Sequence, residues 1–83
     1  MAEQRTADIT AGPGGVMTDE VGVVTGELTL RTRLEDRTAV VSVQYLGAEE
    51  WYVVTGARMP LACAADLDAV HATAVALLNR PEG

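Results

Sequence analysis

Apolar and polar residues alternate along the middle of the chain, from residue 27 to residue 35. One side of this stretch carries Leu28, Leu30, Thr32 and Leu34, and the other carries Glu27, Thr29, Arg31, Arg33 and Glu35. A period of two over this length predicts a β-strand with one buried face.

Two more β-rich runs follow, at residues 38–46 and 51–55, after interruptions at 36–37 and 47–50. Folding the chain back at the first interruption places Leu30 opposite Val43, and folding it at the second places Val43 opposite Val54. Both hairpins put the same residues of the middle run on one face, and a slip of one residue would break this agreement. The pattern therefore predicts a three-stranded antiparallel meander. Asp36-Arg37 is not an ideal two-residue turn, so a wider first loop is expected.

The N-terminal part of the chain lacks such a pattern. Residues 12–15 read Gly-Pro-Gly-Gly, a composition typical of loops, so we expect residues 1–20 to form a flexible tail. Residues 21–24 are apolar and form a fourth strand if the chain bends at Thr25-Gly26. The predicted organisation is a tail over residues 1–20 and a single α+β domain over residues 21–83.

A helix is predicted near the C-terminus, beginning between Leu61 and Asp66 and ending near Arg80, where Pro81 stops it. Its apolar stripe consists of Leu67, Val70, Ala74, Leu77 and Leu78. The sheet face that it would cover carries Leu28, Leu30, Val43, Tyr45, Tyr52 and Val54. The expected fold class is thus α+β, with a three- or four-stranded antiparallel meander and one C-terminal helix packed on one face.

Size and charge narrow the classes of function. A domain within 83 residues buries a marginal core, so we expect oligomerisation to stabilise it. All six basic residues are arginine and the net charge is −6, which disfavours binding to nucleic acid. Arginine without lysine, with abundant Ala, Val and Gly, indicates a GC-rich genome such as that of an actinobacterium.

The number of cysteines and the hydropathy of the sequence predict where in the cell the protein resides. Cys63 is the only cysteine, so no disulfide forms within the chain. No stretch of 18 apolar residues and no apolar signal core is present in the sequence. These features predict a reduced, cytoplasmic protein with no membrane contact.

Residues able to carry chemistry are few. Cys63 and His71 cannot meet if both lie on one helix, and Asp68 with His71 is only half of a metal site. The acidic residues at the predicted turns are Glu35, Asp36, Glu49 and Glu50. Exposed turns do not raise a carboxyl pKa as catalysis requires, so we predict no catalytic, cofactor or metal site and no enzymatic activity. A reactive thiol at Cys63 is kept as a minor alternative.

The sheet face turned away from the helix is the predicted interaction surface. Its candidate residues are Trp51, Leu46, Val53, Val40, Arg31 and Arg33. Exposed large apolar groups mark interfaces, and Trp and Arg are enriched among interface anchors. Three occupants remain open: a second copy of the chain, an unidentified protein partner, or the N-terminal segment of the same chain.

The leading functional hypothesis is a small, non-enzymatic interaction or regulatory protein that forms a homodimer through this face. The alternative is a nucleic-acid-associated regulator using Arg31, Arg33 and Arg37, since single-strand binders combine basic grooves with aromatic side chains. The order of three strands and a helix resembles part of a double-stranded-RNA-binding domain in topology only. The basic loop and helix residues of such a domain are absent, so the resemblance implies no function.

Overall fold

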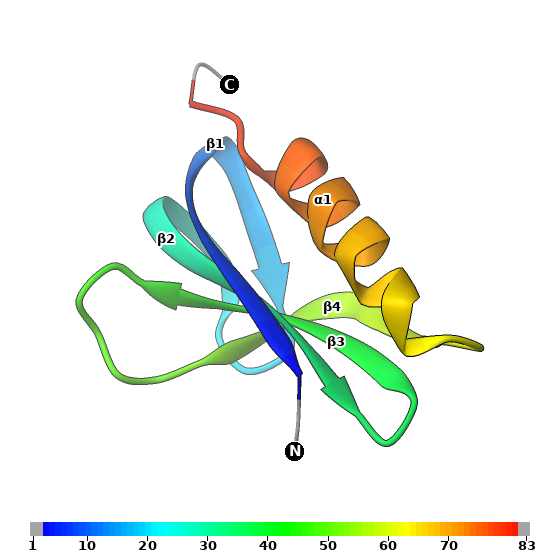
Figure 1. The fold of residues 1–83 in the computed structure, drawn as a ribbon. Helices are drawn as coiled ribbons and strands as arrows, with labels where there is room; N and C mark the ends of the chain where they lie inside the picture. The colour runs from blue at the N-terminus through cyan, green and yellow to red at the C-terminus, as the bar shows by residue number, and fades with distance from the viewer. Residues whose placement is uncertain (1–2, 82–83) are drawn as a thin grey trace.

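A computed structural model describes residues 3–81 as an antiparallel sheet with a C-terminal helix (Figure 1). The elements are β1 (Gln4–Thr18), β2 (Gly22–Glu35), β3 (Thr38–Tyr45), β4 (Tyr52–Pro60), a 3-10 turn (Ala64–Asp66) and α1 (Leu67–Leu78). The predicted α+β class, with one C-terminal helix on an antiparallel sheet, is confirmed. The strands follow one another in the sheet in the order β1-β2-β3-β4.

The hairpin of β2 and β3 has the predicted register, with Leu30 opposite Val43. The expectation of a wider loop was wrong, because Asp36 and Arg37 alone connect the strands. Their φ angles are 53° and 81°. Positive φ at both central residues is characteristic of a type I′ turn, whose twist matches that of the flanking strands.

The hairpin of β3 and β4 differs from the predicted register by two residues, since Val43 lies opposite Tyr52 instead of Val54. Its loop spans residues 46–51 and is longer than the predicted loop of residues 47–50. A displacement by two keeps every side chain on its predicted face. The ladder is then interrupted between the pairs of Ser42 and Val40, and Gly56 in this part of β4 has a φ of 79°.

The prediction of a flexible tail over residues 1–20 was wrong, because Gln4–Thr18 forms strand β1, which pairs with β2. Residues 21–24 are not a separate strand either, since β2 runs without a break over Gly22–Glu35. The far end of β1 reaches β4 through a single pair, Thr18 with Val54, and this pair closes the curled sheet into a small barrel.

The Gly-Pro-Gly-Gly segment of residues 12–15 is the cause of that closure. The pairs of β1 with β2 run Ala11–Gly26 and then Val16–Val24. Four residues of β1 therefore lie opposite Thr25 alone, and such a bulge bends its strand sharply. A side chain at Gly15 would place its Cβ 2.7 Å from the carbonyl oxygen of Val24, at a φ of 68°. Only glycine fits there.

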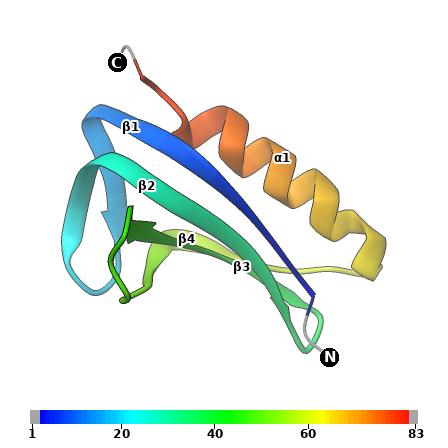
Figure 2. The same ribbon diagram turned by 60° about the vertical axis from the view of Figure 1, so that its left-hand side comes forward.

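The core fills the barrel and the space beneath α1. Its buried side chains are Ile9, Ala11, Val16, Val24, Leu28, Leu30, Val41 and Val43. Helix α1 runs beside the first half of β1 and packs on β1 and β2 more than on β3 (Figure 2). Two predictions of burial were wrong for this reason: Leu77 is 61% exposed and Tyr45 is 42% exposed.

Candidate interaction surface

The outer face is the surface of the sheet opposite α1, and strand register assigns its side chains to rows. Arg31, Ser42 and Val53 form one row across β2, β3 and β4. The next row, toward the Asp36-Arg37 turn, consists of Arg33, Val40 and Arg58. Because paired residues share a face, three arginines from two strands lie near one end of the outer face.

Arg31 and Trp51 are brought together on this face. The guanidinium carbon of Arg31 lies 4.1 Å from the centroid of the Trp51 ring, well within the range of about 6 Å for a cation–π contact. Trp51 lies at the end of the β3–β4 loop and is half-buried. The two predicted anchors thus form one unit, in which the arginine covers part of the tryptophan ring.

The other predicted residues lie on or beside the same face with unequal exposure. Val40 is 2% exposed and Val53 is half-buried. Leu46 lies in the β3–β4 loop and is 53% exposed. The accessible surface of the outer face therefore comes from its arginines, from Trp51 and from Leu46, and the valine side chains contribute little.

The two arginines of β2 are incompletely hydrogen-bonded. The Nε atoms of Arg31 and Arg33 are buried and have no hydrogen-bond partner within residues 3–81. Arg33 also forms an ion pair with Glu35 through its Nη2 atom. Burial lowers the pKa of Arg31, the charge of Arg33 lowers it further, and Glu35 partly offsets both effects.

The opposite end of the outer face is acidic. Asp8 on β1 accepts a hydrogen bond of 3.2 Å from the Thr29 hydroxyl in the row beyond Arg31. Glu27 lies one row further, and Glu50 is exposed in the adjoining loop. The outer face therefore changes sign along the strands. Toward the Asp36-Arg37 turn its three arginines outnumber Glu35, and toward the β3–β4 loop its charged residues are acidic.

Sequence reasoning missed the contributions of Arg58 and Asp8 to this face. Asp8 was missed because β1 was taken for a tail. Arg58 was missed because its orientation depends on the irregularity of the β3–β4 ladder. From Thr6 to Ala11 polar residues alternate with apolar ones, and this alternation was the available signal for β1.

The residues weighed for catalysis lie elsewhere. His71 lies on α1, and its Nδ1 atom is 3.0 Å from the Thr32 hydroxyl, in a hydrogen bond between helix and sheet. Cys63 is exposed, just before the 3-10 turn. Within residues 3–81, no three His, Cys, Asp or Glu side chains are grouped so that they could hold a metal ion. In the same part of the chain, no helix has the length and hydropathy needed to cross a membrane.

Comparisons of the chain with protein-family models, with curated proteins and with solved structures found no match.

Proposed function

We propose that this chain is a non-enzymatic interaction protein that forms a homodimer through its outer face. The observation that carries the proposal is the change of sign along that face, with the Arg31–Trp51 pair between its two ends. A two-fold axis running across the strands near Trp51 would place the basic end of one copy over the acidic end of the other. Such a surface is self-complementary, as a two-fold interface requires.

The charges on the outer face also favour a two-fold axis across the strands over one parallel to the strands. An axis parallel to the strands would instead bring the two basic ends together, with Arg33 of one copy near Arg33 of the other, and would bring the two acidic ends together. Like charges facing each other across an interface cost several kcal/mol, so the two-fold axis across the strands is favoured over the axis parallel to them.

The nucleic-acid alternative has less support. Arg31 already covers one side of the Trp51 ring, which removes that side as a platform for a stacked base. Asp8 and Glu27 on the same face repel phosphates. A cytoplasmic location belongs to the proposal, and its support is that Cys63, the only cysteine, forms no disulfide within the chain.

A charge swap tests the proposed dimer. Arg33→Glu and Glu27→Arg should each weaken self-association in sedimentation velocity, because each places like charges across the interface. The double variant should restore it, because the opposite charges meet again with their positions exchanged. Arg80→Glu is the matched control: it makes the same charge change after α1, away from the outer face, and should leave association unchanged. Failure of the double variant to recover would contradict the orientation.

Replacing Trp51 with alanine tests whether the outer face is the dimer interface. Trp51→Ala should weaken association by about 2 kcal/mol, roughly thirtyfold in Kd, as expected for a hot-spot residue. Leu77→Ala, on the opposite side of the molecule, provides the comparison and should have no such effect. A protein that remains monomeric at micromolar concentration before any substitution would refute the proposal.

A further inference from the structure

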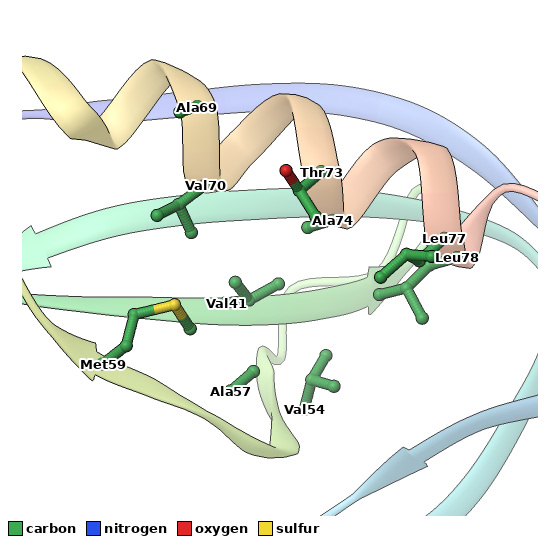
Figure 3. Close-up of a pocket in the computed structure, with 10 residues that line it drawn as sticks. All are labelled: Val41, Val54, Ala57, Met59, Ala69, Val70, Thr73, Ala74, Leu77 and Leu78. Atoms are coloured by element: carbon green, nitrogen blue, oxygen red, sulfur yellow. The ribbon is translucent and has the colours of Figure 1, made fainter.

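An apolar groove runs between α1 and β4, on the side of the helix away from β1. Side chains from α1 and from β3 and β4 point toward one another across it (Figure 3). Its volume is about 470 Å³, within the range of about 300–1,000 Å³ that is usual for small-molecule sites. The groove exists because α1 packs mainly on β1 and β2 and leaves β4 uncovered.

The lining of the groove is aliphatic. Its residues are Val41, Val54, Ala57, Met59, Ala69, Val70, Thr73, Ala74, Leu77 and Leu78. None of them is charged or aromatic, and only Thr73 carries a side-chain hydroxyl. An occupant in contact with this surface must be uncharged there, and a flexible hydrocarbon chain matches it better than a planar ring does.

The composition of α1 supports a binding role for the groove. Between Asp68 and Arg80, α1 carries no charged residue, and Leu77 is 61% exposed at the groove. A surface helix with solvent on its outer side ordinarily carries charged residues there. Contiguous exposed apolar surface on a small protein marks a binding site.

A basic group lies at one end of the groove. A second hollow, of about 110 Å³, shares Leu77 and Leu78 with the groove and is also lined by Arg80 and by glycines of the β1 bulge. Arg80 is exposed and forms no ion pair with any other of residues 3–81. The aliphatic groove therefore has a positively charged residue beside the end formed by Leu77 and Leu78.

The strand that borders the groove is a poor template for an added peptide strand. Pro60 has no N–H to donate, and the ladder of β4 is interrupted near Gly56, where φ is 79°. Edge prolines and irregularities of this kind discourage pairing with another strand. An extended peptide that adds a strand to β4 is therefore a poor fit to the groove.

We propose that the groove binds a free single-chain amphiphile with an anionic head, such as a long-chain carboxylate. The hydrocarbon tail lies between α1 and β4, against Val54, Val70 and Leu78, and the carboxylate pairs with Arg80. This site is separate from the outer face, so it goes beyond the proposed self-association and does not depend on it.

Titration of the full-length, 15N-labelled protein with dodecanoate below its micelle-forming concentration tests the proposal. Amide signals of the groove residues should shift saturably. Leu77→Asp should abolish the shifts, because it places a charge where the hydrocarbon lies. Ala76→Asp is the matched control, since it adds the same charge at the preceding position of α1, outside the groove lining, and should leave binding intact.

The role of Arg80 has its own readout. Arg80→Gln should weaken dodecanoate binding about threefold, as loss of an exposed ion pair does. Binding of dodecanol, which has no charge, should not change. Equal weakening of both ligands would overturn the placement of the head group.

Three outcomes would overturn the proposal as a whole. One is the absence of saturable shifts, and another is their loss in Ala76→Asp as well as in Leu77→Asp, with both variants folded by circular dichroism. The third is a different occupant. A dimer abolished by Leu77→Asp would assign the groove to a second copy, and Leu77-dependent flotation with phosphatidylglycerol vesicles would assign it to a membrane surface.

Discussion

The two long sides of α1 are attached to the sheet in different ways. Toward β1 and β2, polar contacts fix the helix: Arg5 forms an ion pair of 2.7 Å with Asp68, and His71 lies 3.0 Å from the Thr32 hydroxyl. Near the end of the helix, Thr10 is held at both backbone groups. Its N–H donates to the Asn79 side chain at 2.9 Å, and its carbonyl accepts from the Arg80 N–H at 2.7 Å.

Toward β4, the helix has apolar neighbours only. Within residues 3–81, no hydrogen bond or ion pair joins α1 to β4, and the side chains of both line the open groove. Directional contacts along one side therefore determine where the helix lies. The opposite side contributes apolar contact without completing the core, and this leaves room for a ligand.

Two leucines of α1 give the largest expected difference between the sides. Leu67 is 0% exposed and Leu77 is 61% exposed. Leu67→Ala should lower the free energy of unfolding by about 3 kcal/mol, since it leaves a cavity in the core, whereas Leu77→Ala should change it by about 0.5 kcal/mol or less. Urea denaturation monitored by circular dichroism measures both. Equal losses would show that the groove side is as well packed as the core.

Two threonines test the polar contacts. Thr32→Val removes the hydroxyl that bonds His71 at a fully buried position, and about 1 kcal/mol of stability should be lost. Thr73→Val, the same change in the groove, should be close to neutral. A double-mutant cycle of Thr32→Val with His71→Ala isolates the coupling between the two side chains. A coupling near zero would remove this hydrogen bond from the account of helix placement.

The ion pair of Arg5 with Asp68 should give the smallest effect. The two side chains are 41% and 70% exposed, so Arg5→Gln should cost about 0.5 kcal/mol at low salt. The loss should disappear in 1 M salt, because exposed charges are then screened. Substitutions in the aliphatic groove should not show this salt dependence. An Arg5→Gln effect that persists in 1 M salt would point to lost packing of the arginine stem.

The β2–β3 hairpin was predictable because its alternation is long and its register satisfies two neighbours at once. The same constraint explains why the two-residue error in the β3–β4 hairpin left the faces correct. The helix was predictable from its spacing and from Pro81. In each case the information lies within a few neighbouring residues.

Strand β1 was missed because its inward side is formed by small side chains such as Ala7 and Ala11, and because glycines interrupt it. In this fold those glycines make the bend that carries Thr18 to Val54, which only the whole sheet reveals. The predicted Arg31 and Trp51 do meet, but the acidic end of the outer face depends partly on β1. The groove was beyond sequence reasoning, since it depends on how far α1 lies toward one side of the sheet.

The two hydrogen bonds at the backbone of Thr10 have a consequence for synthesis of the chain. The groups that bind Thr10 lie 69 and 70 positions further along the sequence. At about 5–20 residues per second, a ribosome needs on the order of several seconds to travel that distance. During that interval the edge of β1 at Thr10 is not covered, because Asn79 and Arg80 have not yet been synthesised. Until Asn79 and Arg80 have been added, the N–H and the carbonyl of Thr10 lack the partners that they have in the finished molecule.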